Sequence, residues 1–281
     1  MAVDFRRDGV RSSLVWDVLS AVVSARVAAT GRDALDIVDV GGGTGGLAVP
    51  FAALGHHVTV VDPSPDALAA AHRRAAEAGA RLTSVQGEAA SLDSVVGPGA
   101  ADLVICHNVL EYVEEPAAAM SAIARVLRPS ATVSVLVSNA IAAVLHRALA
   151  GRFAEARALL PGGHGAAGSP PQGGSGGIGP SQGGSGGMGP LGRNSRAGLG
   201  GIFPPETIQR FTLPELTALV EQAGLRVGEA HGLRIFGGLV PGGLLEGDAA
   251  AAEALRALEE AAASVPPLRD IAAQLHVLGH R

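Results

Sequence analysis

The sequence predicts an α/β domain with a doubly wound, mostly parallel sheet. Two observations support this prediction: short apolar runs of strand length alternate with helical patterns, and 281 residues are enough to bury a large core. The chain is 47% hydrophobic but only 3% aromatic. Its core must therefore consist mainly of Ala, Val and Leu.

The first half of the chain contains five predicted strands separated by helices. Apolar residues recur at helical spacing over 12–29, 47–53, 65–78 and 116–127. Short apolar runs predict strands at 35–40, 57–61, 82–85, 102–106 and 132–137. This alternation implies right-handed crossovers, and hence parallel neighbouring strands.

The second half begins with an abrupt change of composition. Residues 161–201 are rich in Gly, Ser, Pro and Gln and contain a ten-residue repeat, so we expect a disordered insertion. Thr212 with Glu215 predicts a capping box for a helix that ends before Gly224. A helix at 249–263 and strands at 225–229 and 272–278 follow. We therefore expect residues 1–160 and 202–281 to form one domain that the insertion interrupts.

Composition and charge exclude several classes of protein. The single Cys106 excludes an intrachain disulfide framework and a zinc cluster built on thiolates, and favours a reducing, cytoplasmic setting. We expect no metal and no membrane association, because the uncharged stretch 129–145 is short and interrupted by polar residues. A net charge of −5 and few aromatic residues argue against a nucleic-acid binder of the base-stacking type.

A glycine-rich loop follows the first predicted strand and opens a helix, where bare backbone can approach a ligand. Gly41, Gly43 and Gly46 fit the dinucleotide fingerprint G-x-G-x-x-G. Asp39, Gly41, Gly43 and Gly45 fit the acidic-x-G-x-G-x-G loop of Rossmann-like methyltransferases. Both patterns need an acid after the second strand to bind ribose hydroxyls, and Asp62 supplies it, so the loop alone leaves both open. A glycine-rich turn without a ligand is the third interpretation.

Three later segments resemble class I S-adenosylmethionine-dependent methyltransferases. They are Gly87-Glu88-Ala89 after the third strand, residues 102–112 with the fourth strand, and residues 122–129, which lead into the fifth. The resemblance implies a Rossmann-like, seven-stranded, mostly parallel sheet with an antiparallel last strand. It also implies S-adenosylmethionine as cofactor, with Glu88 in the acidic loop that frames adenine.

A closer resemblance is to the bacterial tRNA carboxymethoxyuridine carboxyl methyltransferases. It rests on residues 9–11 with Trp16, and on segments 106–112, 138–140, 145–146, 150–153, 232–236 and 274–277. The resemblance implies that the cofactor is held by Arg11, Gly41, Gly42, Asp62, Ala89, Ala90 and His107. It also implies that Arg234 clamps the carboxylate of the acceptor.

Methyl transfer itself makes modest demands on the protein. The sulfonium methyl is already activated, so the site must chiefly align the acceptor and exclude water. A carboxylate acceptor is ionised at neutral pH, so we assign no acid or base, and Arg234 orients the nucleophile. Asn139, His146 and Tyr112 are further candidates for the acceptor side. For a hydroxyl or amine acceptor, His107 or His146 would be the base to consider.

The chain departs from the tRNA-modifying family in one segment. The neutral Gly/Ser repeat, with only Arg193 and Arg196 near its end, stands where the family has lysines. Phosphate contacts supply much of RNA affinity, so tRNA and a small molecule both stay open as acceptors. The competing interpretations are an NAD(P)-dependent oxidoreductase, disfavoured because a Tyr/Lys pair is impossible without lysine, and a non-catalytic cofactor-binding protein.

Overall fold

A computed structural model describes residues 11–160, 208–240 and 249–281, and side chains from residue 14 onward within these ranges. The predicted insertion at 161–201, with Arg193 and Arg196, lies outside the described residues. The side chain of Arg11 also lies outside them, although its backbone opens the first helix.

One seven-stranded sheet contains strands from both halves of the chain. The strands are β1 (Asp36–Val40), β2 (His57–Asp62), β3 (Thr83–Gln86), β4 (Ala101–His107), β5 (Leu127–Ser138), β6 (Arg226–Leu233) and β7 (Gln274–His280). Their order is β3-β2-β1-β4-β5-β7-β6. The first five run parallel, and β7 pairs antiparallel with both β5 and β6. The predicted fold class is confirmed, including the antiparallel last strand.

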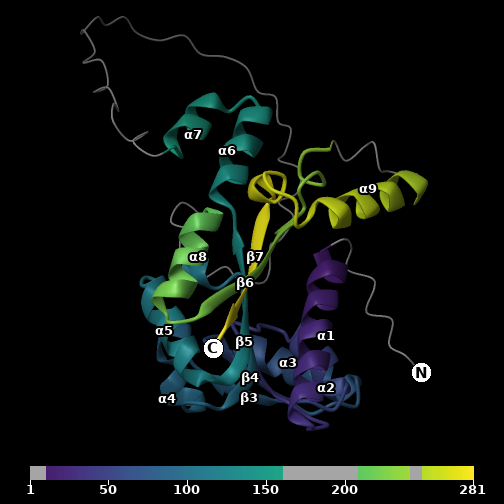
Figure 1. Ribbon diagram of the computed structural model, residues 1–281, viewed down its shortest axis with the longest axis vertical. Coiled ribbons are helices and arrows are strands. Elements are labelled where there is room, and N and C mark those ends of the chain that lie inside the picture. The colour runs from purple at the N-terminus through teal and green to yellow at the C-terminus, as the bar shows by residue number, and fades with distance from the viewer. Residues whose placement is uncertain (1–10, 161–207, 241–248) are drawn as a thin grey trace, which may run out of the picture.

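Helices cover both faces of the sheet (Figure 1). They are α1 (Arg11–Thr30), α2 (Ala48–Ala53), α3 (Pro65–Glu77), α4 (Leu92–Val96), α5 (Pro116–Val126), α6 (Ala140–Leu149), α7 (Phe153–Ala158), α8 (Leu213–Gln222) and α9 (Ala249–Ala262). Short 3₁₀ turns are η2 (Ala89–Ser91), η3 (Leu110–Tyr112) and η6 (Arg269–Ile271). One apolar cluster lies between the sheet and α4, α5 and α8, and a second lies on the face of α1, α2 and α3. A third, smaller cluster contains Ile235, Ala262 and Ala272.

The local signals mark the ends of α8 correctly, whereas several strand bounds differ from those predicted. Thr212 and Glu215 form the expected capping box of α8, and Gly224 follows that helix with φ +78°, a conformation that glycine adopts without strain. The fifth strand begins earlier than predicted, at Leu127 instead of 132. The reason is tertiary, because Leu127 pairs with Ala101 of β4.

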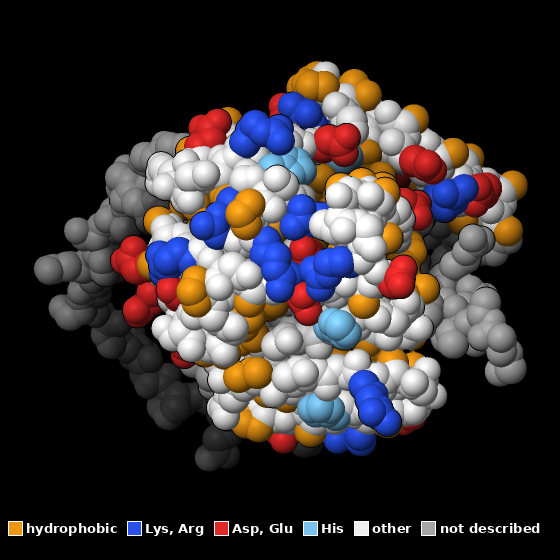
Figure 2. Space-filling view, turned by 60° about the horizontal axis from the view of Figure 1, so that its bottom comes forward, with side chains coloured by type: hydrophobic (Ala, Val, Ile, Leu, Met, Phe, Trp, Pro, Cys, Tyr) orange, Lys and Arg blue, Asp and Glu red, His pale blue; other side chains and the backbone are white. Residues whose placement is uncertain are grey.

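An ionic cluster joins α1 to the amino ends of the parallel strands. The buried Asp102 carboxylate accepts hydrogen bonds from Arg26, Arg32 and Arg128 at 2.7–3.2 Å. Arg32 and Arg128 also pair with Asp36. Basic side chains surround acidic ones on this face of the molecule (Figure 2). The cluster lies at the end of the sheet opposite to the glycine-rich loop.

Candidate cofactor and acceptor site

The glycine-rich loop leaves β1 at the carboxyl edge of the sheet and is held by its neighbours. The amide of Gly41 donates to the carbonyl of Val61 at 2.7 Å, and the amide of Gly43 donates to Oδ2 of Asp62 at 2.9 Å. The β1–β4 register pairs Val40 with Cys106, so Gly41 follows beside His107. The loop, the end of β2 and the end of β4 therefore form one continuous edge.

Backbone dihedral angles distinguish the two glycine patterns. Gly41, Gly43 and Gly45 have φ of +64°, +54° and +78°, in the left-handed region that favours glycine. Gly46 does not lie in that region, and a Cβ placed on it would meet nothing within 4 Å. The dinucleotide fingerprint requires a third glycine for close packing at position 46, whereas the methyltransferase loop requires one at position 45. The geometry matches the methyltransferase loop.

The loop leaves room for a ligand on one side only. A Cβ on Gly42 would lie 2.6 Å from Cγ of Asp39, and one on Gly41 would collide with Val109. At Gly43 the nearest atom would be 3.9 Å away, the carbonyl oxygen of Gly41. Bare backbone thus packs against protein at two positions and faces open space at the third. This arrangement fits a nucleoside cofactor that approaches at Gly43.

The two acids of the site occupy different environments. Asp62 stands at the end of β2 and accepts from the amides of Gly43 and Ser64, at 2.9 Å each. A carboxylate has about four acceptor positions, so Asp62 keeps capacity for ribose hydroxyls. Asp39 is 4% exposed and accepts from the amide of Ala48, and burial raises its pKa to about 7. Asp39 therefore supports the loop, whereas Asp62, 7% exposed, holds the amides of Gly43 and Ser64 at the end of β2.

The remaining cofactor candidates line the same edge. Glu88 is exposed just before η2, Ala89 is buried and Ala90 is exposed. The amide of Gly87 donates to the carbonyl of Asp62, which ties this segment to the end of β2. His107 ends β4, and its Nε2 lies 2.7 Å from Oγ of Ser134.

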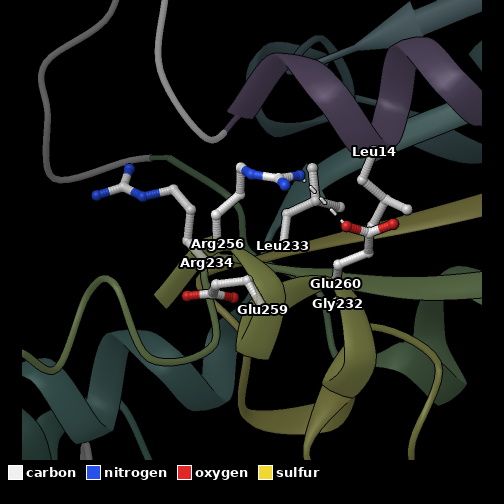
Figure 3. Close-up of a pocket in the computed structure, with 7 residues that line it drawn as sticks. All are labelled: Leu14, Gly232, Leu233, Arg234, Arg256, Glu259 and Glu260. Carbon is white, nitrogen blue, oxygen red and sulfur yellow. Dashed lines mark hydrogen bonds and ion pairs between the residues drawn. The ribbon is translucent and has the colours of Figure 1, made fainter. Parts of the chain in front are cut away.

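Arg234 lies just beyond β6 at the same end of the sheet and adopts φ +58°. The turn that follows it is held by the buried carboxylate of Glu259, which accepts from the amides of Ile235, Phe236 and Gly237 at 2.6–2.9 Å. Figure 3 shows the guanidinium of Arg234 extending away from Glu259, whereas Arg256 turns toward Glu260. The fold thus presents Arg234 on a braced turn.

Two other acceptor-side candidates, Asn139 and Tyr112, differ in burial and in hydrogen bonding. Asn139 is 2% exposed, its Oδ1 caps α6 at Ile141, and its Nδ2 donates to the carbonyls of Asp270 and Ala272. It serves the backbone, so we omit it from the acceptor site. Tyr112 is 41% exposed on η3.

His146 is half-buried on α6 and faces the chain beyond β6. A Cβ on Gly238 would lie 2.8 Å from Nε2 of His146. Tyr112 and His146 therefore stay candidates for the acceptor side.

Sequence reasoning missed three charged residues near Tyr112. Burial and the charge of Arg147 lower the pKa of Arg210, so the two guanidinium groups influence each other. Glu111 is buried; its Oε1 accepts from the amide of Ser138, and its Oε2 has no partner within the described residues. The residues before Arg210 show neither helical nor strand periodicity, so no local signal indicated its position. Only the fold brings Arg210 near Arg147 and Tyr112.

No group of His, Cys, Asp and Glu within the described residues has the arrangement of a metal site. Among the helices that the structure describes, none combines the length and the apolar character required to cross a bilayer.

Comparisons with known proteins find similarity to methyltransferases. Residues 37–130 match the family model described as a methyltransferase domain. The tRNA 5-carboxymethoxyuridine methyltransferase of Escherichia coli K12 is 30% identical over 158 residues, 54% of this chain and 57% of that protein. The ubiquinone biosynthesis O-methyltransferase of Xanthomonas campestris pv. campestris is 35% identical over 146 residues, 50% of this chain and 58% of that protein. The chain thus spans little more than half the length of these relatives.

Solved structures share the fold. Magnesium protoporphyrin IX methyltransferase from Synechocystis PCC 6803 aligns over 100% of this chain and 89% of its own, with 15% identity and a TM-score of 0.53. An S-adenosylmethionine-dependent methyltransferase from Mesorhizobium loti aligns over 97% and 100%, with 17% identity and a TM-score of 0.53. The chain thus has the fold of these methyltransferases, and its residues 37–130 match the methyltransferase domain model.

Proposed function

We propose that the chain is an S-adenosylmethionine-dependent methyltransferase that methylates a carboxylate oxygen, with carboxymethoxyuridine of tRNA as the acceptor. The observation that carries the proposal is the position of Arg234, on a turn braced by Glu259 at the carboxyl end of the sheet. Guanidinium binds a carboxylate through two parallel hydrogen bonds. The 30% identical relative from Escherichia coli supports this acceptor.

The residues proposed to hold the cofactor follow from the geometry of the edge. Asp62 accepts from the ribose hydroxyls, the backbone at Gly43 lies against the ligand, and Glu88 with Ala89 and Ala90 borders the adenine. Gly42 and Gly45 shape the loop, and Asp39 supports it. By resemblance, Arg11 and His107 complete the set.

The proposed mechanism needs alignment rather than acid–base chemistry. The cofactor, when bound, supplies a methyl group activated on a sulfonium. Arg234 orients the acceptor carboxylate, which keeps its charge as long as it is bound by a permanent cation. The fixed geometry of Asp62 and Arg234 on one edge then provides proximity, the main catalytic contribution for such a reaction.

A small-molecule acid or hydroxyl compound is the second candidate acceptor. The 35% identical relative acts in ubiquinone biosynthesis according to its name, and this chain has a net charge of −5. Burial lowers the pKa of His107 to about 3, which makes its imidazole a weak base, so His146 is the base to consider for a hydroxyl acceptor. We propose a cytoplasmic setting in either case, with residues 1–160 and 202–281 as one domain.

Mass spectrometry of tRNA nucleosides and metabolites from cells that lack the protein tests the acceptor. Loss of the methyl ester from tRNA supports the first candidate, and an unchanged tRNA inventory with one missing metabolite ester or ether supports the second. In vitro, Arg234→Lys should raise KM for the acceptor about tenfold or more, because it removes the bidentate contact. Arg256→Lys is the matched control, since Arg256 lines one pocket together with Arg234 (Figure 3) but pairs with Glu253 and Glu260.

A further inference from the structure

Four hydrogen-bonded side chains cross the sheet from the candidate cofactor edge to its outermost strand. They are His107 on β4, Ser134 on β5, His276 on β7 and His231 on β6, called here the histidine row. Oγ of Ser134 lies 2.7 Å from Nε2 of both His107 and His276. Nδ1 of His276 lies 3.3 Å from Nδ1 of His231, and these two rings stack.

Three members of the histidine row are buried and His107 is half-buried, and the rings are uncharged at neutral pH. Ser134 and His276 are 0% exposed, and His231 is 7% exposed. Burial lowers the pKa of all three histidines. Each imidazole therefore carries one N–H and one bare nitrogen. A buried polar row is stable only when its donors and acceptors match.

If the hydroxyl hydrogen of Ser134 also finds its acceptor within the row, two arrangements of the hydrogens remain. In the first, His107 donates from Nε2 to Ser134, Ser134 donates to His276, and His276 donates from Nδ1 to His231. In the second, every donor and acceptor is exchanged, and His107 carries its hydrogen on Nδ1. The two arrangements thus present opposite chemistry at the free nitrogen of His107, for which no hydrogen-bond partner occurs among the residues that the structure describes.

The far end of the row favours the first arrangement. Oε2 of Glu229 lies 3.8 Å from Nε2 of His231, and a carboxylate attracts an N–H there because it can only accept. Arg269 also influences His231 but is paired with Asp270. With its hydrogen on Nε2, His231 accepts at Nδ1, and the direction of every other hydrogen bond in the row follows.

We propose that Glu229 sets the tautomer of His107 through the histidine row, so that Nδ1 of His107 is a bare acceptor for an N–H or O–H donor of the bound ligand. Glu229, His231, His276 and Ser134 are then positioning residues. The inference rests on the proposed function only for the identity of that ligand, which is S-adenosylmethionine.

Nitrogen NMR on the full-length chain without cofactor tests the tautomer directly. With ¹⁵N-labelled histidine, long-range ¹H–¹⁵N correlations separate protonated from bare ring nitrogens, and single substitutions assign the nine histidines. We expect His107 to be protonated on Nε2 and bare on Nδ1. Glu229→Ala, at a side chain that is 74% exposed, should shift both nitrogens of His107 to values intermediate between the two tautomers.

Two variants on β5 separate the row from a general effect on the sheet. Ser134→Ala should alter His107 while His231 keeps its hydrogen on Nε2. Thr132→Val is the matched control, because Thr132 contacts only His280 among the histidines that the structure describes. A protonated Nδ1 on His107 in the parent, or His107 signals unchanged in Glu229→Ala, overturns the proposal.

Calorimetry with S-adenosylmethionine links the tautomer to binding. If Glu229→Ala leaves about half of the molecules with the correct tautomer, affinity should fall about twofold, since apparent affinity scales with the competent fraction. Unchanged affinity in a variant whose His107 tautomer has shifted refutes the role of Nδ1 as ligand acceptor. A parent chain that takes up no S-adenosylmethionine refutes the proposed function instead, and the NMR result still decides the tautomer.

Discussion

Asp39→Asn should make the protein more stable at alkaline pH although it removes an acid from the glycine-rich loop motif. Asp39 is 4% exposed, and burial raises its pKa from 3.8 to about 7. Between these values the folded protein holds a proton that the unfolded chain has lost, so stability falls as pH rises. Over about three pH units, at about 1.36 kcal/mol per unit, the loss reaches about 4 kcal/mol.

The Asp39→Asn variant is expected not to lose stability in this way as pH rises. The asparagine side chain that Asp39→Asn introduces is neutral at every pH and keeps an oxygen that can accept from the amide of Ala48. The two proteins should therefore be equally stable near pH 4, and the variant should exceed the parent by up to about 4 kcal/mol at pH 8.

Urea denaturation at a series of pH values measures the difference. The single Trp16, stacked on Phe51 at 4.7 Å, reports unfolding by its fluorescence. Asp33→Asn, at an exposed residue in the turn after α1, is the control for loss of a negative charge. A variant less stable than the parent at pH 8, or a stability difference that does not change with pH, would refute the assignment of Asp39 as a desolvated support of the loop.

Four further predictions concern the site and its supports. Gly41→Ala should weaken S-adenosylmethionine binding at least tenfold by calorimetry, because its Cβ collides with Val109 at a positive φ, whereas Gly46→Ala should bind normally. Asp62→Ala should weaken S-adenosylmethionine binding by about two orders of magnitude, since two charge-assisted hydrogen bonds to ribose are worth about 3 kcal/mol or more. Equal affinity of variant and parent would contradict the role of Asp62 in binding the ribose. Glu259→Gln should lower stability to urea by about 2 kcal/mol and raise KM for the acceptor, because its single oxygen can accept from Phe236 and Gly237 only if its NH2 group faces the amide of Ile235. Asp102→Asn should cost about 3–5 kcal/mol in the same assay but leave cofactor affinity unchanged, because Arg26, Arg32 and Arg128 lose their buried counter-charge at the opposite end of the sheet.

Much of the cofactor edge could be predicted from short stretches of sequence. Gly41 to Gly46 follow an apolar run and precede a helix, and Asp62 follows the next strand, so both had to meet at one sheet edge. The residues of the acceptor side were harder to predict from the sequence. The side-chain amide of Asn139 could bind a ligand, but its partners Asp270 and Ala272 lie more than 130 residues away in the chain. Nothing local could show that its amide was already engaged.

The sequence by itself determined the alternation of strands and helices, the aliphatic core and the presence of a glycine loop with two acids, because periodicity and turn chemistry are local properties. Only the tertiary structure decided which glycines adopt positive φ, and that both acids are buried while burial raises the pKa of Asp39. It alone brought His107, Ser134, His276 and His231 into one row. Those outcomes depend on strand register and burial, which arise from contacts between distant segments of the chain.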